Sequence, residues 1–238
     1  NGDILIKPGI GSLASGMSGE GRVEEPELIL DILKNHIKKK LIFKNKSFLI
    51  TAGPTFEMID PVRFIGNFSS GKMGYELAKE ASRLGAKVHL ISGPSNEQIN
   101  DENIILKRIV SADEMFDECS KVFNDIDIFI MSAAVSDYKP SKKNHNKIKK
   151  DKSEKISVQL VKNKDILKSL ALKKTKGQKV IGFSLETEDE LKNATKKLKN
   201  KNLDAIILNS LNDEGAGFNL PTNKISFITS SYLKDFTV

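Results

Sequence analysis

One stretch decides the fold: residues 126–131 read Ile-Asp-Ile-Phe-Ile-Met. A second run, Ala-Ile-Ile-Leu at residues 205–208, has the same character. Both runs are apolar on the two faces that a strand presents, which is typical of central strands in a parallel sheet covered by helices on each side. These two runs therefore predict a parallel sheet within an α/β fold.

Working outward, strand-like and helix-like segments alternate along the rest of the chain. Apolar runs predict strands at residues 48–51, 87–92, 104–110, 126–131, 156–161, 180–185, 205–208 and 225–229. Helical spacing of apolar residues predicts helices at residues 25–39, 72–84, 113–123, 165–173 and 189–199. The alternation predicts a Rossmann-like, doubly wound, mostly parallel sheet with helices on both faces and an N-terminal arm.

The first thirty residues differ from the rest because six glycines punctuate them and no periodic apolar pattern begins before Leu28. We interpret this stretch as a loop or arm that leads into the helix at residues 25–39. The sequence thus predicts two regions, an arm with a linker helix at residues 1–45 and a main domain at residues 46–238.

Composition excludes several classes of protein. The single cysteine, Cys119, cannot form an internal disulfide, and its apolar helical neighbours are typical of an inert buried thiol. No N-terminal apolar stretch has the length of a signal sequence or a membrane span, so neither is expected. A reducing, cytoplasmic setting is the expectation.

The charge of the chain favours an anionic ligand. It has 38 basic against 31 acidic residues, a net charge of +7, with the excess concentrated at residues 38–46, 142–155 and 192–201. The absence of tryptophan and the presence of only three tyrosines argue against a nucleic-acid partner, because no aromatic stacking platform accompanies the lysines. Phosphorylated small molecules fit better.

The loops that follow the predicted strands hold the unusual residues. They read Ala-Gly-Pro-Thr at 52–55, Ser-Gly-Pro-Ser at 92–95, Ser-Ala-Ala-Val-Ser-Asp at 132–137, Glu-Thr at 186–187 and Asn-Ser at 209–210. Ligands bind at the carboxyl ends of strands in such sheets. The lysine-rich stretch between residues 138 and 156 is too polar to pack, and its place after one of these loops predicts a flap over the site.

Residues 66–73, Gly-Asn-Phe-Ser-Ser-Gly-Lys-Met, have the spacing of a phosphate-binding P-loop. Met73 stands where a hydroxyl would hold magnesium, and a thioether is a poor ligand for a hard cation, so a standard P-loop is rejected. Two interpretations stay open: a glycine-serine loop that binds an anion, or an N-terminal helix turn without a ligand. No dinucleotide fingerprint follows the first main strand.

A series of motifs in one order carries a family resemblance. They lie at residues 50–55, 60–65, 67–74, 88–94, 133–138, 147–150, 161–163, 182–183, 186–187 and 201–204. With these motifs the chain resembles the phosphopantothenoylcysteine synthetase half of the bacterial bifunctional phosphopantothenoylcysteine decarboxylase/synthetase. The resemblance covers nearly all of residues 46–229.

The resemblance implies a carbon–nitrogen ligase of coenzyme A synthesis. It implies CTP and Mg2+ as co-substrate and cofactor, 4'-phosphopantothenate activated as an acyl-cytidylate with release of pyrophosphate, and displacement of CMP by cysteine. The residues alone do not decide between CTP and ATP. The resemblance also implies a homodimer, with the strands from about residues 156 and 225 as interface elements.

The resemblance further implies which residues form the site. The catalytic residues would be Asn67, Asp137 and Lys147, and no metal ligand is assigned. Substrate-binding positions would be Gly53, Ser69, Gly71, Gly74, Ala133 and Ala134. Nucleotide-binding positions would be Met131, Ser132, Ala133, Asp137, Lys147, Lys164, Asp165, Ile166, Leu167, Phe183, Lys197 and Lys201.

The arm resembles the substrate-clamp tail of the decarboxylase half, with Ser15 where that tail has a cysteine. A hydroxyl is a far weaker acid than a thiol, so no decarboxylase activity is expected, and FMN is expected only for the decarboxylase half. Pro54 and Lys164 also depart from the family pattern. Two alternatives remain: an NAD(P)-dependent reductase on the same sheet, and a non-enzymatic module that binds phosphate or nucleic acid.

Overall fold

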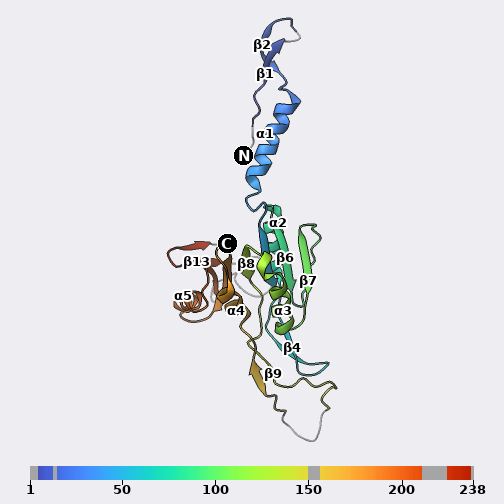
Figure 1. The fold of residues 1–238 in the computed structure, drawn as a ribbon, viewed down its shortest axis with the longest axis vertical. Helices are drawn as coiled ribbons and strands as arrows, with labels where there is room; N and C mark the ends of the chain where they lie inside the picture. The colour runs from blue at the N-terminus through green and yellow to red at the C-terminus, as the bar shows by residue number, and fades with distance from the viewer. Residues whose placement is uncertain (1–4, 13–14, 150–155, 211–223, 237–238) are drawn as a thin grey trace. The chain divides into compact units, whose positions relative to one another are not determined.

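The computed structural model describes residues 5–12, 15–149, 156–210 and 224–236 (Figure 1). The chain divides into two compact units, Asn1–Lys44 and Asn45–Val238. This division falls one residue before the boundary expected between residues 45 and 46.

The N-terminal unit contains a β-ribbon and a helix. Strands β1 (Gly9–Ser12) and β2 (Ser18–Arg22) pair antiparallel, and helix α1 spans Pro26–Lys40. The helix confirms the prediction for residues 25–39, whereas the prediction of a loop was wrong for the two strands. Glycine and serine dominate both strands, so they pair through backbone groups and carry no alternating apolar pattern that the sequence could reveal.

A single large sheet organises the second unit. In the described residues it has eight strands in the order β14-β13-β12-β11-β8-β3-β6-β7. The six strands from β12 to β7 run parallel, and β13 and β14 continue the sheet antiparallel. The strands are β3 (Ser47–Ala52), β6 (Lys87–Ser92), β7 (Ile104–Arg108), β8 (Ile128–Met131), β11 (Lys179–Glu186), β12 (Ala205–Ser210), β13 (Ile225–Ile228) and β14 (Leu233–Phe236). This topology confirms the predicted doubly wound, mostly parallel sheet.

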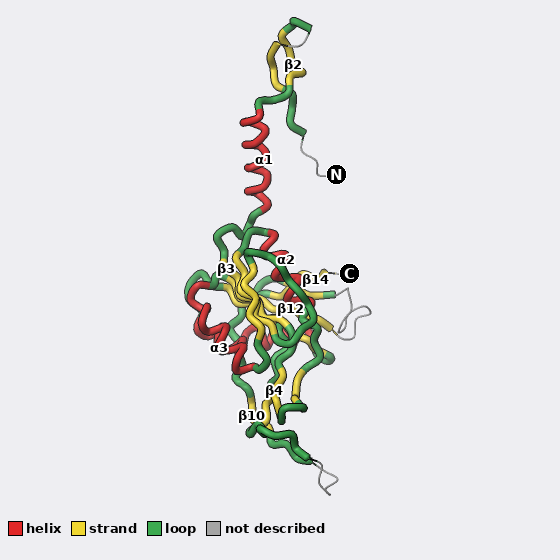
Figure 2. The backbone as a smooth tube through the Cα atoms, turned by 90° about the vertical axis from the view of Figure 1, so that its right-hand side faces the viewer, coloured by secondary structure: helices red, strands yellow, loops and turns green. Residues whose placement is uncertain are grey.

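Helices cover both faces of the sheet, and Figure 2 shows α2 and α3 on opposite sides of it. They are α2 (Lys72–Arg83), α3 (Ala112–Val122, continued by the 3-10 turn η1, Phe123–Asp125), α4 (Ile166–Lys173) and α5 (Glu190–Asn200). Helix α2 packs on β3 and β6, and α5 packs on β11 and β12. Within the described ranges, none of the helices combines the length and apolarity that a bilayer crossing requires.

An apolar core in the described residues fills the space between α3, α4 and the central strands. It includes Leu49 of β3, Phe129 of β8 and Val180 of β11. Cys119 lies in this core with no exposed surface, and burial raises the pKa of its thiol to about 12. The prediction that Cys119 is buried is therefore confirmed, and the raised pKa agrees with an inert thiol.

Two small two-stranded ribbons extend from the main sheet. One pairs β4 (Phe56–Met58) with β5 (Phe64–Gly66), and the other pairs β9 (Tyr138–Pro140) with β10 (Leu160–Lys162). The strand predicted at residues 156–161 was wrong in its bounds, because the strand begins at Leu160. Its partner is β9, outside the main sheet, so its apolar residues are half-exposed.

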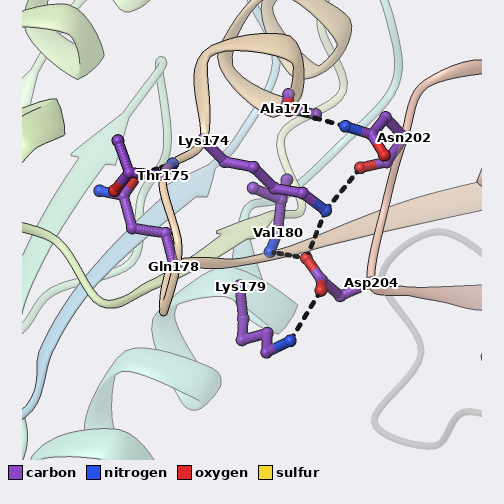
Figure 3. A network of polar contacts seen from close by, with 8 residues as sticks. All are labelled: Ala171, Lys174, Thr175, Gln178, Lys179, Val180, Asn202 and Asp204. Carbon is purple, nitrogen blue, oxygen red and sulfur yellow. Dashed lines mark hydrogen bonds and ion pairs between the residues drawn. The ribbon is translucent and has the colours of Figure 1, made fainter.

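A polar network joins the start of β11 to the turn before β12 (Figure 3). The Asp204 carboxylate accepts hydrogen bonds from Lys174 Nζ at 2.8 Å, from Lys179 Nζ at 3.0 Å and from the Val180 N–H at 2.9 Å. Partial burial alone would raise the pKa of Asp204, but these donors outweigh it and hold the pKa below its ordinary value. The ionised carboxylate thus fixes the two strands at their amino ends.

Candidate functional site

A cavity of about 540 Å³ lies at the carboxyl ends of β3, β8 and β11. This is the edge of the sheet where the strand order predicts ligand binding. Its volume lies within the range of small-molecule sites. Its described lining comprises Thr51, Met131, Ala133, Val135, Ser136, Asp137, Tyr138, Lys162, Asn163, Lys164, Asp165, Ile166, Leu167, Lys168, Phe183, Lys197 and Lys201.

The loop after β8 forms one wall and is tied to the end of β3. The Ser132 hydroxyl donates to the Thr51 carbonyl at 2.6 Å, and the Ala133 N–H donates to Thr51 Oγ1 at 3.2 Å. Farther along, the Ser136 N–H donates to the hydroxyl of Thr55 at 3.0 Å. Residues of small size in this loop leave room for a ligand, while the hydroxyls of Thr51 in β3 and of Thr55 just after it fix the backbone of the loop.

Close backbone contacts hold the start of α2 against the end of β3. Gly53 and Gly71 adopt φ values of 73° and 85°, in the left-handed region that favours glycine. A Cβ on Gly71 would lie 3.2 Å from the Gly53 nitrogen, and a Cβ on Gly74 would lie 2.5 Å from Ala52 Cβ. The glycines are therefore needed for this approach.

Asn67 links this region to the wall of the cavity. Its Nδ2 donates to the Val135 carbonyl at 3.0 Å, with the Ala134 carbonyl 3.5 Å away. Val135 lines the cavity. The Asn67 amide thus connects the glycine-rich turn before α2 to the loop after β8.

The opposite wall carries lysines with specific partners. Lys201 forms an ion pair of 2.7 Å with Asp165, which also caps α4 by accepting from the Lys168 N–H at 2.9 Å. Lys197 Nζ donates to the Phe183 carbonyl at 2.9 Å. Burial lowers the pKa of Lys197, and the nearby charge of Lys201 lowers it further, against the opposing effect of neighbouring carboxylates. An anion bound here would relieve the repulsion between the two ammonium groups.

The charge balance of the cavity suits a polyanion. Its described lining includes five lysines but only two aspartates, Asp137 and Asp165. One lysine, Lys164, places its ammonium 3.8 Å from the ring centre of Phe116, a cation–π contact. Two others have the partners given above, Lys201 with Asp165 and Lys197 with the Phe183 carbonyl.

The predicted nucleotide-binding residues gather in this cavity, and ten of the twelve line it. The two others are Ser132, whose hydroxyl donates to the Thr51 carbonyl, and Lys147. Lys147 lies exposed in the long segment that joins β9 to β10, which we call the lysine-rich excursion. The lysine-rich flap predicted there lies in part outside the described residues, at positions 150–155.

The predicted substrate-binding residues form a neighbouring cluster. Of these six, only Ala133 lines the cavity, and the other five are Gly53, Ser69, Gly71, Gly74 and Ala134. The Ala134 N–H donates to the Gly53 carbonyl at 2.9 Å, and the Gly71 N–H donates to Ser69 Oγ at 3.3 Å. The cluster and the cavity thus share the loop after β8.

Sequence reasoning missed some of the lining, notably Thr51 and Asn163. Asn163 Nδ2 donates to the Ser136 carbonyl at 2.9 Å, while its Oδ1 is buried and has no hydrogen-bond partner among the described residues. Such an orphaned acceptor costs stability unless a bound donor completes it, which is consistent with a ligand site. Thr51 could have been found as a polar residue at the end of an apolar strand, whereas Asn163 had no signal beyond its family motif.

Metal-binding side chains are sparse in the part of the chain that the structure describes. No group of three or more His, Cys, Asp or Glu residues there is placed to hold a metal ion. Magnesium bound with a nucleotide needs only one or two protein carboxylates, because phosphate oxygens and water supply the rest. Asp137 and Asp165 on the cavity wall fit that donor set.

Comparison with known proteins places these features in a family. Residues 43–236 match the family model of the DNA/pantothenate metabolism flavoprotein C-terminal domain. The chain is 44% identical over 235 residues to a cysteine/cysteine sulfinic acid decarboxylase from an unknown prokaryotic organism. It is 42% and 41% identical to the coenzyme A biosynthesis bifunctional protein CoaBC of Borreliella burgdorferi and of Bacillus subtilis. These matches cover 97%, 97% and 99% of this chain but only 65%, 58% and 57% of the relatives.

Solved structures agree with the family match. The crystal structure of the C-terminal domain of CoaBC is 35% identical, with a TM-score of 0.68 over 82% of this chain and 87% of that one. A Cab2 mutant in complex with phosphopantothenate-cysteine shares the fold with a TM-score of 0.69 at 19% identity, over 90% of this chain and 88% of that one. On the family match over residues 43–236, the chain belongs to the DNA/pantothenate metabolism flavoprotein C-terminal domain family.

Proposed function

We propose that the chain is a phosphopantothenate–cysteine ligase that uses CTP. One observation carries the proposal: a lysine-lined cavity of about 540 Å³ at the carboxyl ends of the central strands, in a chain similar to the C-terminal domain of a bifunctional coenzyme A biosynthesis protein. The names of the CoaBC relatives give the pathway. Ten of the twelve residues that the family resemblance assigns to the nucleotide line this cavity.

The proposed reaction has two steps. A carboxylate oxygen of 4'-phosphopantothenate bonds to the α-phosphorus of CTP, and the bond from that phosphorus to the β-phosphate oxygen breaks, so pyrophosphate leaves. The cysteine amine then bonds to the acyl carbon, CMP leaves with the electron pair, and the nitrogen loses a proton. Mg2+ held by phosphate oxygens with Asp137 and Asp165 would neutralise charge on the departing pyrophosphate.

We assign a separate role in this reaction to each of five residues in or near the cavity. Lys197 and Lys201 would bind phosphate oxygens, and Phe183 would form an apolar wall beside the nucleotide. Asn67 would orient the loop between the phosphopantothenate and nucleotide sides through its bond to the Val135 carbonyl. Lys147 would contribute a mobile ammonium to the pyrophosphate as it leaves.

The working form proposed is a homodimer, without nucleic-acid or membrane partners. Leu160 and Val161 of β10 are each 42% exposed, which is unusual for apolar strand residues and suits an interface. Sedimentation of the chain at micromolar concentration measures this directly. A clean monomer would contradict the proposed dimer.

The ligase proposal is tested by pyrophosphate release from the chain with 4'-phosphopantothenate, Mg2+ and either CTP or ATP. We expect release that requires 4'-phosphopantothenate and prefers CTP. Lys201→Ala should lower it, and Lys199→Ala should not, because Lys199 is an exposed lysine in the last turn of α5, two residues before Lys201, and lies outside the cavity lining. Tight NADPH binding, or carbon dioxide from cysteine sulfinate, without pyrophosphate release would favour a different enzyme class.

A further inference from the structure

An ion pair between the buried carboxylate of Asp60 and the partly exposed guanidinium of Arg63 holds the backbone of the lysine-rich excursion beside Lys147. Asp60 lies in the turn between β4 and β5, and its side chain has no exposed surface. Its Oδ2 accepts from Arg63 Nε at 3.0 Å and from the Ile148 N–H at 3.1 Å. Arg63 Nη2 in turn donates to the Ile148 carbonyl at 2.8 Å. We name this arrangement the Asp60–Arg63 clamp.

The clamp engages both polar backbone groups of one residue. With the N–H and the C=O of Ile148 both bonded, the excursion cannot shift along the turn without breaking both contacts. A second attachment lies four residues earlier, where the Asn144 N–H donates to the Ile59 carbonyl at 2.9 Å. Lys147 lies between the two attachments, so its backbone is fixed while its side chain remains exposed.

The clamp is built to remain charged. Burial alone would raise the pKa of Asp60, but hydrogen bonds from the Arg63 side chain and from the N–H groups of Val62, Ile148 and Arg63 outweigh it. They hold the pKa of Asp60 well below its usual range. A buried carboxylate is stable only when its acceptors are satisfied in this way. A segment that only has to remain solvated does not need a buried carboxylate to fix its backbone. The clamp therefore indicates that the position of this segment is important for function.

We infer that the Asp60–Arg63 clamp positions Lys147 for the ligase reaction by fixing the backbone next to it. The inference rests on the proposed function, because the role of Lys147 belongs to that proposal. Asp60 and Arg63 act here through Lys147 and are positioning residues. Misplacing a reacting group by about 1 Å can cost on the order of 100-fold in rate, so loss of the clamp should be visible in turnover.

The test is a double-mutant cycle between Arg63→Met and Lys147→Ala, read as kcat for pyrophosphate release. Arg63→Met should lower kcat roughly 10- to 100-fold in the wild-type background. It should cause no further loss in the Lys147→Ala background, because the residue that it positions is absent. Arg63→Lys should restore part of the rate, since an ammonium can pair with Asp60 but does not match the two-point guanidinium contact.

Two controls separate positioning from folding. Arg83→Met removes an exposed arginine paired with Glu80 at 2.6 Å on α2 and should leave kcat unchanged. Limited trypsin digestion reports on the clamp without any turnover, and cleavage after Lys147 should be faster in Arg63→Met than in the wild type. If Arg63→Met does not fold, Arg63→Lys carries both measurements.

The outcomes distinguish the two proposals. Equal losses from Arg63→Met in both backgrounds, or unchanged tryptic cleavage, would overturn the inference while leaving the ligase proposal intact. Absence of pyrophosphate release from folded wild-type protein with either nucleotide would overturn both. Loss confined to the background that retains Lys147 would support the inference.

Discussion

Gly74→Ala tests the close approach between α2 and the end of β3. The added Cβ would lie 2.5 Å from Ala52 Cβ, 2.9 Å from Ser132 Oγ and 3.0 Å from the Thr51 carbonyl oxygen. Carbon atoms in contact normally lie about 3.5–4.0 Å apart, so helix and strand must separate by about 1 Å. We therefore expect the packing between them to be disrupted.

Two opposing contributions set the magnitude. Overpacking costs about 1–3 kcal/mol, and three contacts this short place Gly74→Ala at the upper end. Alanine has the higher helix propensity and offsets about 1 kcal/mol. The net loss in the free energy of unfolding is about 2 kcal/mol. For a unit of this size it corresponds to a fall in Tm of roughly 4–8 °C.

Scanning calorimetry of the chain measures this fall. The matched control is Glu76→Ala, at an exposed position of the same helix, which should change the free energy of unfolding by less than about 0.5 kcal/mol. The same displacement moves the turn before α2, so the KM for 4'-phosphopantothenate should rise in Gly74→Ala. A Tm equal to or above that of the wild type would refute the argument, because the methyl group would then have found room.

Three further predictions concern the core and its polar contacts. Asp204→Ala should lower the free energy of unfolding by about 2 kcal/mol at pH 7, because the Val180 N–H and two lysines lose a charged acceptor (Figure 3). Since the pKa of Asp204 is lowered in the folded state, its contribution to stability is present above the unfolded value of about 3.9 and is lost as pH falls through the folded pKa. Urea titrations at pH 7 and below pH 3.9 should therefore show that the difference in the free energy of unfolding between wild type and variant shrinks. A constant difference would contradict this. Gln178→Leu leaves two buried carbonyls and one N–H unpaired and should cost about 2–3 kcal/mol in urea unfolding, whereas a loss under 0.5 kcal/mol would mean that the contacts are dispensable. Cys119 should resist a thiol reagent at pH 8 in the native chain and react fully in urea; rapid native reaction would show that the core opens.

The central sheet could be predicted because strands that are buried on both faces consist mainly of apolar residues, and this is visible in the sequence of each strand alone. Residues 126–131 and 205–208 are apolar whatever their partners, and the strand ends then indicate where ligands bind. The three-residue strands β4, β5 and β9 could not be predicted, since so short a segment shows no period. Their pairing depends on chain segments that fold back locally outside the main sheet.

The candidate site was predictable to the extent that its residues follow strand ends or match a family motif. Asp137 lies in the loop after β8, Phe183 belongs to a family motif inside β11, and both line the cavity. The contact of Asp60 with Ile148 joins positions 88 residues apart, and no local pattern encodes such a pairing. The same holds for the bond between Asn67 and Val135.

Mass spectrometry of a quenched reaction examines the ligase chemistry itself. Folded chain is mixed with 4'-phosphopantothenate, CTP and Mg2+, first without cysteine and then with it. The account predicts an acyl-cytidylate of phosphopantothenate without cysteine, which is replaced by CMP and phosphopantothenoylcysteine when cysteine is added. Neither an acyl-nucleotide nor pyrophosphate with CTP or with ATP would contradict it.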